Sequence, residues 1–380
     1  MSQIDINYHR LLSIIMESGY NYETANRPGV QCRQISSVNI EVTLEKFPLL
    51  TTKGMYWKGI VGELIWFLKG DSNIKYLIDN GISIWNKDAY NWYMKNSNQK
   101  DLYSIDQFVE LIKTTSNKEL QKGFEYGDGD YCLGDVGRNY GVQWRDWTGY
   151  IDGQGEEHFD QFHNLIENLN KKNPINRRNI VTAWNPLETE LTALPPCHWA
   201  FEIIPRPLSY TDRIGLTGES DQEHLSNLWD EMIKGNAEAK DKLNKSLINI
   251  PKYAFTLKWS QRSVDSFLGL PFNIASYALL AEIIGMLTGM LALEVIANLS
   301  NVHVYEPHFE VVKEQLKRSP VEYGGPDVFF SERFIKDIKL FKKNKMSLDC
   351  FLNNLQIADF ELSGYQSFGP LKAEMLEPTA

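Results

Sequence analysis

The sequence has few cysteines, and their spacing argues against two common uses of this residue. Only four occur among 380 residues, at Cys32, Cys132, Cys197 and Cys350, and no two of them form a CxxC pair. A disulfide framework or a structural zinc site needs cysteines at closer, repeated spacing. We therefore expect reduced thiols, no metal site and a cytoplasmic location.

The sequence also lacks an excess of positive charge. Its 39 lysines and arginines are outnumbered by 49 aspartates and glutamates, which gives a formal net charge of −10. The overall field of such a chain does not attract nucleic acid or an anionic membrane surface. We expect no nucleic-acid partner, although a local arginine cluster could still hold a small anion.

No stretch has the features of a signal peptide or of a typical membrane span. The first 20 residues contain no basic segment followed by an unbroken apolar run. Residues 274–293 are apolar and long enough to cross a bilayer, but they include Glu282 and lack basic flanks. We expect a buried helix there, with any break at Gly285 or Gly289, and no membrane partner.

The hydrophobic pattern predicts an α+β fold. Helical spacing of apolar residues covers 4–18, 57–70 and 157–172, and strand-like runs cover 33–44, 179–184, 199–204 and 253–260. Residues 206–251 are polar and separate two of these strands, so we expect a partly helical surface insertion. We predict one catalytic domain over residues 1–380 that carries this insertion.

One cysteine has unusual neighbours. The stretch ALPPCHWAF, residues 193–201, places Cys197 between two prolines and His198. A lone cysteine in apolar surroundings usually serves packing. A fixed backbone and a nearby cation, such as an arginine, would instead suit a thiolate nucleophile. These residues alone leave both interpretations open.

Arginine and asparagine side chains occur where they could bind a ligand. Arg177 and Arg178 precede a predicted strand, and Arg262 stands beside Ser263. Guanidinium groups match phosphate oxygens, but paired arginines are more often surface charge, and both could reach one ligand only from a loop. Asn273 begins an apolar helix, where it either caps the helix or offers its amide to a pyrimidine edge.

Two further patterns suit a polar ligand or acid–base chemistry. His303 and Tyr305 are two apart on a predicted strand, so they share one face and could bind a sugar hydroxyl. Glu63 lies in an otherwise apolar helix. A buried carboxylate is costly unless it is paired or acts as an acid or base.

Taken together, the motifs resemble the thymidylate synthase family, which includes phage deoxynucleotide hydroxymethylases. The resemblance implies a central mixed sheet with flanking helices and a homodimer formed through the sheet. It covers most of the chain except residues 206–251 and a shorter segment near 104–118. The matching segments follow the family order and read FPLLTTKGMYWKGIVGELIWFLKGDSNIKYL, ISIW, NYGVQWRDW, NRRNIVTAWNP, ALPPCHWAF, QRSVDSFLGLPFNIASYALL, HVYEPH and GYQSFGPLKAEM.

The resemblance implies roles for the matched residues. Cys197 looks like the nucleophile that attacks C6 of dUMP, after which C5 takes the one-carbon unit of 5,10-methylenetetrahydrofolate. Glu63 matches a general acid/base that acts through water, and Tyr140 a residue involved in removing the C5 proton. Asn273 matches the reader of the uracil edge, and it favours dUMP because cytosine-specific relatives carry aspartate there. The other implied contacts are with the phosphate (Arg27, Arg177, Arg178, Arg262 and Ser263), the sugar hydroxyl (His303 and Tyr305) and the folate or pyrimidine (Lys53, Trp85, Asp265 and Gly269).

The sequence departs from the family pattern at four places. These are RPGVQ at 27–31, DVGRNYG at 135–141 in place of DLGPVYG, Ser300–Asn301 in place of a glycine–aspartate pair, and an extended tail at 376–380. In the family, the arginine pair reaches across the dimer and the C-terminus closes over the folate. We expect a thymidylate synthase. The alternatives are a dUMP hydroxymethylase, in which water reaches the methylene, and a binding protein without catalysis.

Overall fold

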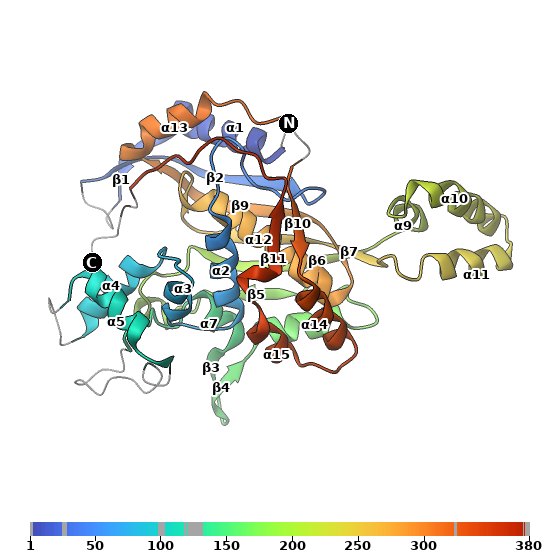
Figure 1. Ribbon diagram of the computed structural model, residues 1–380, viewed down its shortest axis with the longest axis horizontal. Coiled ribbons are helices and arrows are strands. Elements are labelled where there is room, and N and C mark those ends of the chain that lie inside the picture. Colours follow the sequence, from blue (N-terminus) through green and yellow to red (C-terminus); the bar gives the residue numbers. More distant parts are fainter. Residues whose placement is uncertain are drawn as a thin grey trace.

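A mixed β-sheet forms the centre of the molecule (Figure 1). The computed structural model describes residues 3–24, 29–97, 103–117, 120, 132–322, 325–374 and 376. Within these residues the sheet has the order β1-β2-β9-β7-β6-β5, and β8 pairs with β9. Strand β9 runs parallel to β7 and antiparallel to β2, as expected for a mixed α+β fold. The strands are β1 (Tyr20–Glu23), β2 (Gln31–Thr43), β5 (Ile180–Thr182), β6 (His198–Pro207), β7 (Tyr253–Gln261), β8 (Val264–Asp265) and β9 (Leu291–Tyr305).

The long apolar helix α12 (Gly269–Thr288) packs against β7 and β9. By length and composition it could cross a membrane, but 72% of its most apolar window is buried inside the molecule. The predicted buried helix is therefore confirmed. It passes through Gly285 without a break and ends at Gly289, whose positive φ of 71° is the left-handed conformation typical of a helix C-terminus.

Further helices complete the layers around the sheet. Helix α2 packs against α7 and α12, and α8 packs against β5. The largest fully buried side chains, among them Trp66, Trp144 and Trp259, belong to one core cluster that these elements share. The helices are α1 (Gln3–Ser18), α2 (Trp57–Leu68), α3 (Lys75–Asp79), α4 (Asn86–Asn96), α5 (Ile105–Thr114), α7 (Tyr140–Arg145), α8 (Gln161–Leu169), α13 (Phe309–Leu316), α14 (Glu332–Lys342) and α15 (Leu348–Asn354).

The helix predicted at 157–172 is shorter than expected. Residues up to Phe159 belong to the hairpin of β3 (Trp147–Ile151) and β4 (Gly155–Phe159), and α8 starts at Gln161. The carboxylate of Asp160 accepts a hydrogen bond from the backbone N–H of His163 at 2.7 Å. This N-cap determines where α8 begins. The extended residue Asp160 offers its carboxylate to an N–H group of the first helical turn that has no partner within the helix.

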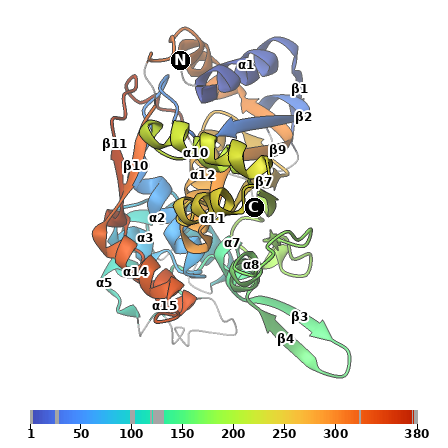
Figure 2. The same cartoon turned by 90° about the vertical axis from the view of Figure 1, so that its right-hand side faces the viewer.

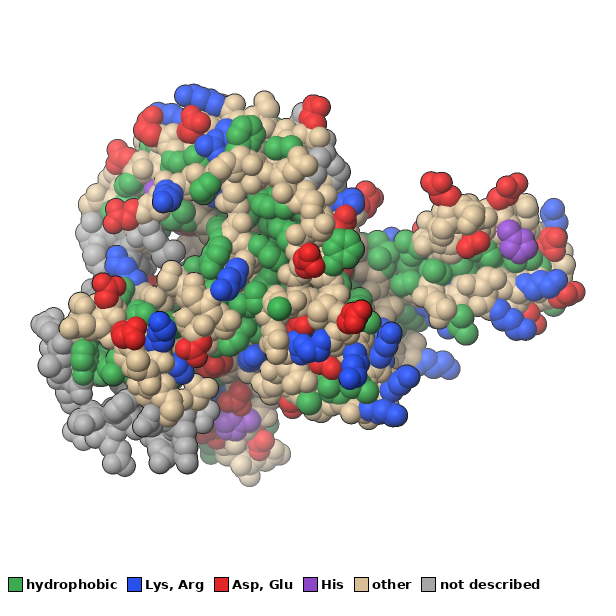
Figure 3. Space-filling view, in the orientation of Figure 1, with side chains coloured by type: hydrophobic (Ala, Val, Ile, Leu, Met, Phe, Trp, Pro, Cys, Tyr) green, Lys and Arg blue, Asp and Glu red, His purple; other side chains and the backbone are tan. Residues whose placement is uncertain are grey.

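Residues between β6 and β7 form a helical arm that projects from the body (Figures 1 and 2). It contains α9 (Tyr210–Gly215), α10 (Glu219–Ile233) and α11 (Ala237–Ser246). The guanidinium of Arg213 fixes the base of the arm by donating to the carbonyls of Leu247 and Pro251. Figure 3 shows side chains of both charges on its surface. The arm has its own small core, formed by Ile214, Leu225, Leu228, Ala239, Leu243 and Leu247.

Candidate active site

The backbone of Cys197 is held from two sides directly before β6. Its N–H donates to the hydroxyl of Tyr140 at 2.8 Å, and its carbonyl accepts from the backbone N–H of Arg262 at 2.8 Å. The Arg262 guanidinium donates to the carbonyls of Pro195 at 2.7 Å and Pro196 at 2.9 Å. A fixed backbone beside a guanidinium is the setting that a thiolate nucleophile requires.

Two buried rings stack behind Cys197. Tyr140 and His198 have ring centroids 4.2 Å apart, and a ring nitrogen of His198 lies 2.9 Å from the hydroxyl of Tyr277. Burial, reinforced by the nearby Cys197 thiol, holds the pKa of Tyr140 well above its usual value, so its hydroxyl stays protonated. Burial lowers the pKa of His198 to about 3. The imidazole is therefore neutral, whereas the guanidinium of Arg262 lies against the two prolines that precede Cys197.

Glu63 projects from α2 toward the rings of Trp85 and Tyr140. Its carboxylate accepts a hydrogen bond from the indole N–H of Trp85 at 2.7 Å, and the Trp85 ring lies 6.1 Å from that of Tyr140. Burial raises the pKa of Glu63 to about 7, although the Trp85 hydrogen bond acts in the opposite direction. A carboxyl group with this pKa can both give and take a proton near neutral pH.

The start of α12 carries a second group of polar side chains. Asp265 accepts hydrogen bonds from the backbone N–H groups of the two residues at 267 and 268, both at 3.0 Å, and so fixes the turn into the helix. The side-chain oxygen of Asn273 accepts from Gln261 at 3.2 Å. Asn273 does not cap the helix, because α12 begins four residues earlier at Gly269. Its orientation is instead set by Gln261.

Pairing of β8 with β9 brings two predicted ligand residues together. Asp265 is opposite His303, and the rings of His303 and Tyr305 lie 4.8 Å apart on β9. The backbone carbonyl of Asn301 lies 2.7 Å from a ring nitrogen of His303. Asn301 has a positive φ of 52° and its side chain donates to the carbonyl of Arg262 at 2.7 Å. Asn301 thus ties the Arg262 segment to β9, and asparagine tolerates its left-handed conformation.

The structure describes the paired arginines among the remaining predicted phosphate ligands. Arg177 and Arg178 lie in an exposed turn before β5, which confirms the loop conformation that a shared ligand would need. Their side chains form no hydrogen bond or ion pair within the described ranges of the chain. Arg27 lies outside the described residues.

Lys53 points into the molecule, beneath the C-terminal segment. Its ammonium group donates to the carbonyl of Phe267, and burial lowers its pKa to about 7 while Asp265 opposes the shift. The backbone N–H of Phe368 donates to the carbonyl of Thr51 at 2.8 Å. The carbonyl of Glu374 lies 2.8 Å from a ring nitrogen of His308. The chain up to Glu374 is therefore docked on the body, and the predicted extension at 376–380 lies outside the described residues from position 377 onward.

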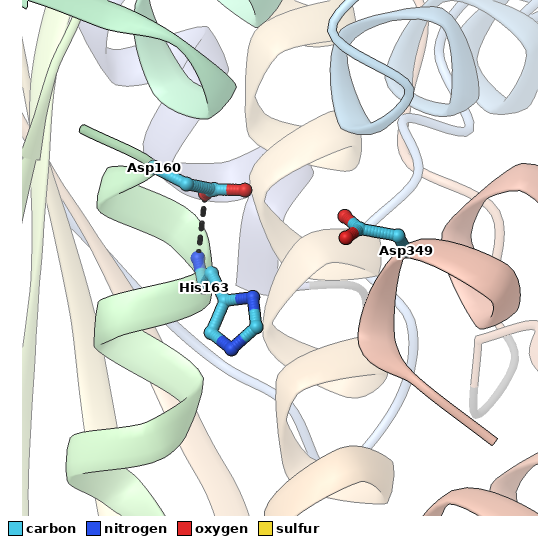
Figure 4. A group of neighbouring side chains, drawn as sticks. All are labelled: Asp160, His163 and Asp349. Atoms are coloured by element: carbon cyan, nitrogen blue, oxygen red, sulfur yellow. Dashed lines mark hydrogen bonds between the residues drawn. The ribbon is translucent and has the colours of Figure 1, made fainter. Parts of the chain in front are cut away.

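One group of potential metal ligands lies away from this site. Ligand atoms of Asp160, His163 and Asp349 come within 4.8 Å of one another (Figure 4). The guanidinium of Arg145 contacts Asp160 at 2.9 Å and also pairs with Asp349. The arginine already supplies the positive charge between these carboxylates, so the group is explained as an ion-pair bridge between α8 and α15.

The comparisons with known proteins agree with this geometry. The family model described as thymidylate synthase matches residues 6–234 and 235–377. The chain belongs to the thymidylate synthase family. A thymidylate synthase of Mesoplasma florum is 31% identical over 373 residues, which cover 97% of this chain and 98% of that protein. Those of Malacoplasma penetrans (33% identical, 97% of this chain and 98% of that protein) and Staphylococcus haemolyticus (30% identical, 98% of each) match over a similar extent.

Within this thymidylate synthase fold, tertiary contacts add residues that the motifs did not single out. Gln261 orients Asn273, and Tyr277 binds His198. A signal for Tyr277 was present, because a tyrosine inside an apolar helix usually finds a hydrogen-bond partner for its hydroxyl. Asn139 caps α7 by accepting from the Tyr140 N–H at 2.8 Å, and asparagine is one of the residues preferred at a helix N-cap.

Proposed function

We propose that this protein transfers the one-carbon unit of 5,10-methylenetetrahydrofolate to C5 of dUMP, giving dTMP and dihydrofolate. The observation that carries the proposal is Cys197, held by Tyr140 and Arg262 in a chain whose full-length relatives are named thymidylate synthase. Those names favour methylation over hydroxymethylation. The folate supplies both the methylene carbon and the hydride that reduces it to a methyl group.

The first step uses the sulfur of Cys197. Its thiolate forms a bond to C6 of the pyrimidine, and the electron pair of the 5,6 double bond moves to the C5–C4–O4 system, which makes C5 nucleophilic. Arg262 lies beside the loop that carries the sulfur and favours the thiolate form. Later, C5 loses its proton and the bond from sulfur to C6 breaks. A water molecule held by Glu63 and the hydroxyl of Tyr140 are the groups that we assign to proton transfer at O4 and C5.

Substrate recognition is assigned to the residues around the start of α12 and to the arginines. Asn273, oriented by Gln261, reads the uracil edge, and His303 and Tyr305 bind the sugar hydroxyl. Arg262, Ser263 and Arg27 bind the phosphate. The residues present also fit a pterin ring, because Asp265 offers a carboxylate for its N–H groups and Trp85 an aromatic surface next to Glu63. Gly269 leaves room beside Asn273, and Lys53 lies under the docked tail.

We further propose that the enzyme is a homodimer joined through the sheet and that Arg177 and Arg178 act on the partner's phosphate site. Ile180 and Ile204 lie on one face of β5 and β6 and are 51% and 45% exposed. Glu202 and Lys258 lie on the same face and form an ion pair at 3.6 Å, so a second copy would cover the two exposed isoleucines together with charges that are already paired. The turn that carries the two arginines leads directly into this face.

Subunit mixing tests this arrangement. Cys197→Ala and Arg178→Ala variants, each with strongly reduced activity, are mixed and allowed to exchange subunits. If the arginine acts across the interface, half of the random dimers carry one complete site, so about a quarter of wild-type activity returns. No recovery, or a monomer that binds dUMP tightly in sedimentation, would refute the shared site.

The four cysteines form no disulfide with one another, and we propose a reducing, cytoplasmic location.

A product assay tests the reaction itself. The protein is incubated with dUMP and methylenetetrahydrofolate, the nucleotide is analysed by mass spectrometry, and dihydrofolate is followed by absorbance. We expect dTMP with an equal amount of dihydrofolate. 5-Hydroxymethyl-dUMP with tetrahydrofolate would mean that water, and not the folate hydride, reaches the methylene. Bound dUMP without either product would indicate a binding protein.

A further inference from the structure

Arg138, two residues before Tyr140 in the chain, forms a fork of ion pairs with Glu188 and Asp146. Its Nε lies 3.1 and 3.2 Å from the two carboxylate oxygens of Glu188. Its Nη1 lies 3.2 Å from the carboxylate of Asp146, and its Nη2 also donates to the Asp146 carbonyl. A guanidinium that contacts two carboxylates in this way fixes both distance and direction, which a single point charge cannot do.

Glu188 is itself firmly held. Its carboxylate accepts hydrogen bonds from Gln143 at 2.5 Å and from Thr148 at 2.7 Å, and its side chain is only 16% exposed. Burial opposes ionisation, but these hydrogen bonds and the charge of Arg138 outweigh it and place the pKa of Glu188 below its usual value. The Glu188 carboxylate is therefore ionised at neutral pH and can pair with the guanidinium of Arg138.

The pair joins the two segments that meet at the reactive cysteine. Residues 136–140 run alongside residues 192–197: the Ala193 N–H donates to the carbonyl of Val136 at 2.9 Å, and Asn139 donates to the carbonyl of Leu194 at 2.8 Å. The Cys197 N–H then bonds the Tyr140 hydroxyl. The approach is so close that a Cβ at Gly137 would lie 2.2 Å from the carbonyl oxygen of Leu191.

We propose that Arg138 is a positioning residue, which clamps the Tyr140 segment onto the Cys197 segment through Glu188 and so fixes the sulfur relative to the tyrosine hydroxyl. Arg138 touches neither group directly. It stands where the family pattern DLGPVYG has proline, so a side-chain clamp replaces part of the backbone restraint of that residue. The inference rests on the proposed reaction for its kinetic consequence, whereas its structural consequence does not depend on it.

The kinetic test removes the guanidinium group of Arg138 while keeping an unbranched side chain. A displacement of about 1 Å between reacting groups can reduce a rate roughly 100-fold. We expect Arg138→Met to lower kcat for dTMP formation about 10- to 100-fold, with less than about a threefold change in the Kd for dUMP. Arg138→Lys keeps the charge without the fork, so its kcat should fall between those of the methionine variant and the wild type.

Two matched arginine variants separate positioning from general stability. Arg333 pairs with Asp359 far along the chain from these segments, and Arg206 makes a long 3.9 Å contact with Asp212 on the arm. Arg333→Met should lower the Tm but leave the kcat of the folded enzyme within about twofold of the wild type, and Arg206→Met should change neither. If Arg138→Met behaves like Arg333→Met, the residue has a structural role only and the proposal is wrong.

Hydrogen exchange measures the clamp without any substrate. Peptides that cover 135–141 and 191–197 contain the amide groups of Ala193 and Cys197, which bond across the two segments. We expect exchange there to be at least about tenfold faster in Arg138→Met than in Arg333→Met. Unchanged exchange overturns the clamp even if dTMP is formed. Faster exchange supports the clamp even if the wild type makes no dTMP, in which case only the proposed reaction fails.

Discussion

The raised pKa of Glu63 predicts that this residue destabilises the folded protein as the pH rises. Burial raises its pKa from 4.5 to about 7. The folded state therefore binds this proton more tightly than the unfolded state does. The resulting stabilisation is fully present below pH 4.5 and is lost as the pH rises through about 7. Replacing Glu63 with glutamine removes the titration and keeps an oxygen that can accept from Trp85.

The magnitude follows from the two pKa values. Because Glu63 ionises more readily in the unfolded state, its titration lowers the free energy of unfolding by about 1.4 kcal/mol at pH 5.5 and by about 3.4 kcal/mol at pH 8.5, relative to a Glu63 that is protonated in both states. The free energy of unfolding of Glu63→Gln relative to the wild type should thus increase by up to about 2 kcal/mol between these pH values. Glu63 keeps some contact with solvent, which places the expected increase at about 1–2 kcal/mol.

Urea denaturation without ligands, at pH 5.5, 7 and 8.5, measures this difference. The protein concentration is held constant, because the stability of a dimer depends on it. Glu223→Gln, an exposed residue of α10, controls for the loss of one negative charge. A difference between Glu63→Gln and the wild type that stays constant within about 0.5 kcal/mol across the three pH values would refute the raised pKa. Glu63→Gln should also lose most of its enzymatic activity. The Glu63 carboxyl, whose burial destabilises the fold, is the group assigned to proton transfer.

Three further substitutions test the assigned roles. Cys197→Ala should abolish dTMP formation while calorimetry still detects dUMP binding, and persistent turnover would exclude Cys197 as the nucleophile. Asn273→Asp should shift the ratio of kcat/KM for dUMP and dCMP toward dCMP, because a carboxyl group changes the hydrogen bonds offered to the base; an unchanged ratio would contradict its role as base reader. Tyr140→Phe removes the acceptor of the Cys197 N–H and the protonated hydroxyl, so kcat should fall at least about 100-fold, and a loss below about threefold would exclude Tyr140 from proton transfer.

Local patterns were sufficient for most of the secondary structure. The helices at 4–18 and 57–70 and the buried helix that ends at Gly289 follow from apolar spacing and glycine chemistry. The error at 157–172 arose because the apolar pattern continues into the β4 hairpin, and only the cap made by Asp160 marks the boundary. Periodicity describes which face is apolar, whereas a cap depends on one side chain reaching a particular N–H group.

The sequence by itself determined the family and the residue types that could do its chemistry, because motifs in family order are a property of the chain alone. Only the tertiary structure decided how those residues work together. It made His198 neutral and brought the guanidinium of Arg262 to the prolines before Cys197, and it showed that Gln261, and not a helix end, orients Asn273. The clamp between Arg138 and Glu188 joins residues 50 positions apart. Burial and contacts between distant segments set pKa values and orientations, and neither is encoded in local spacing.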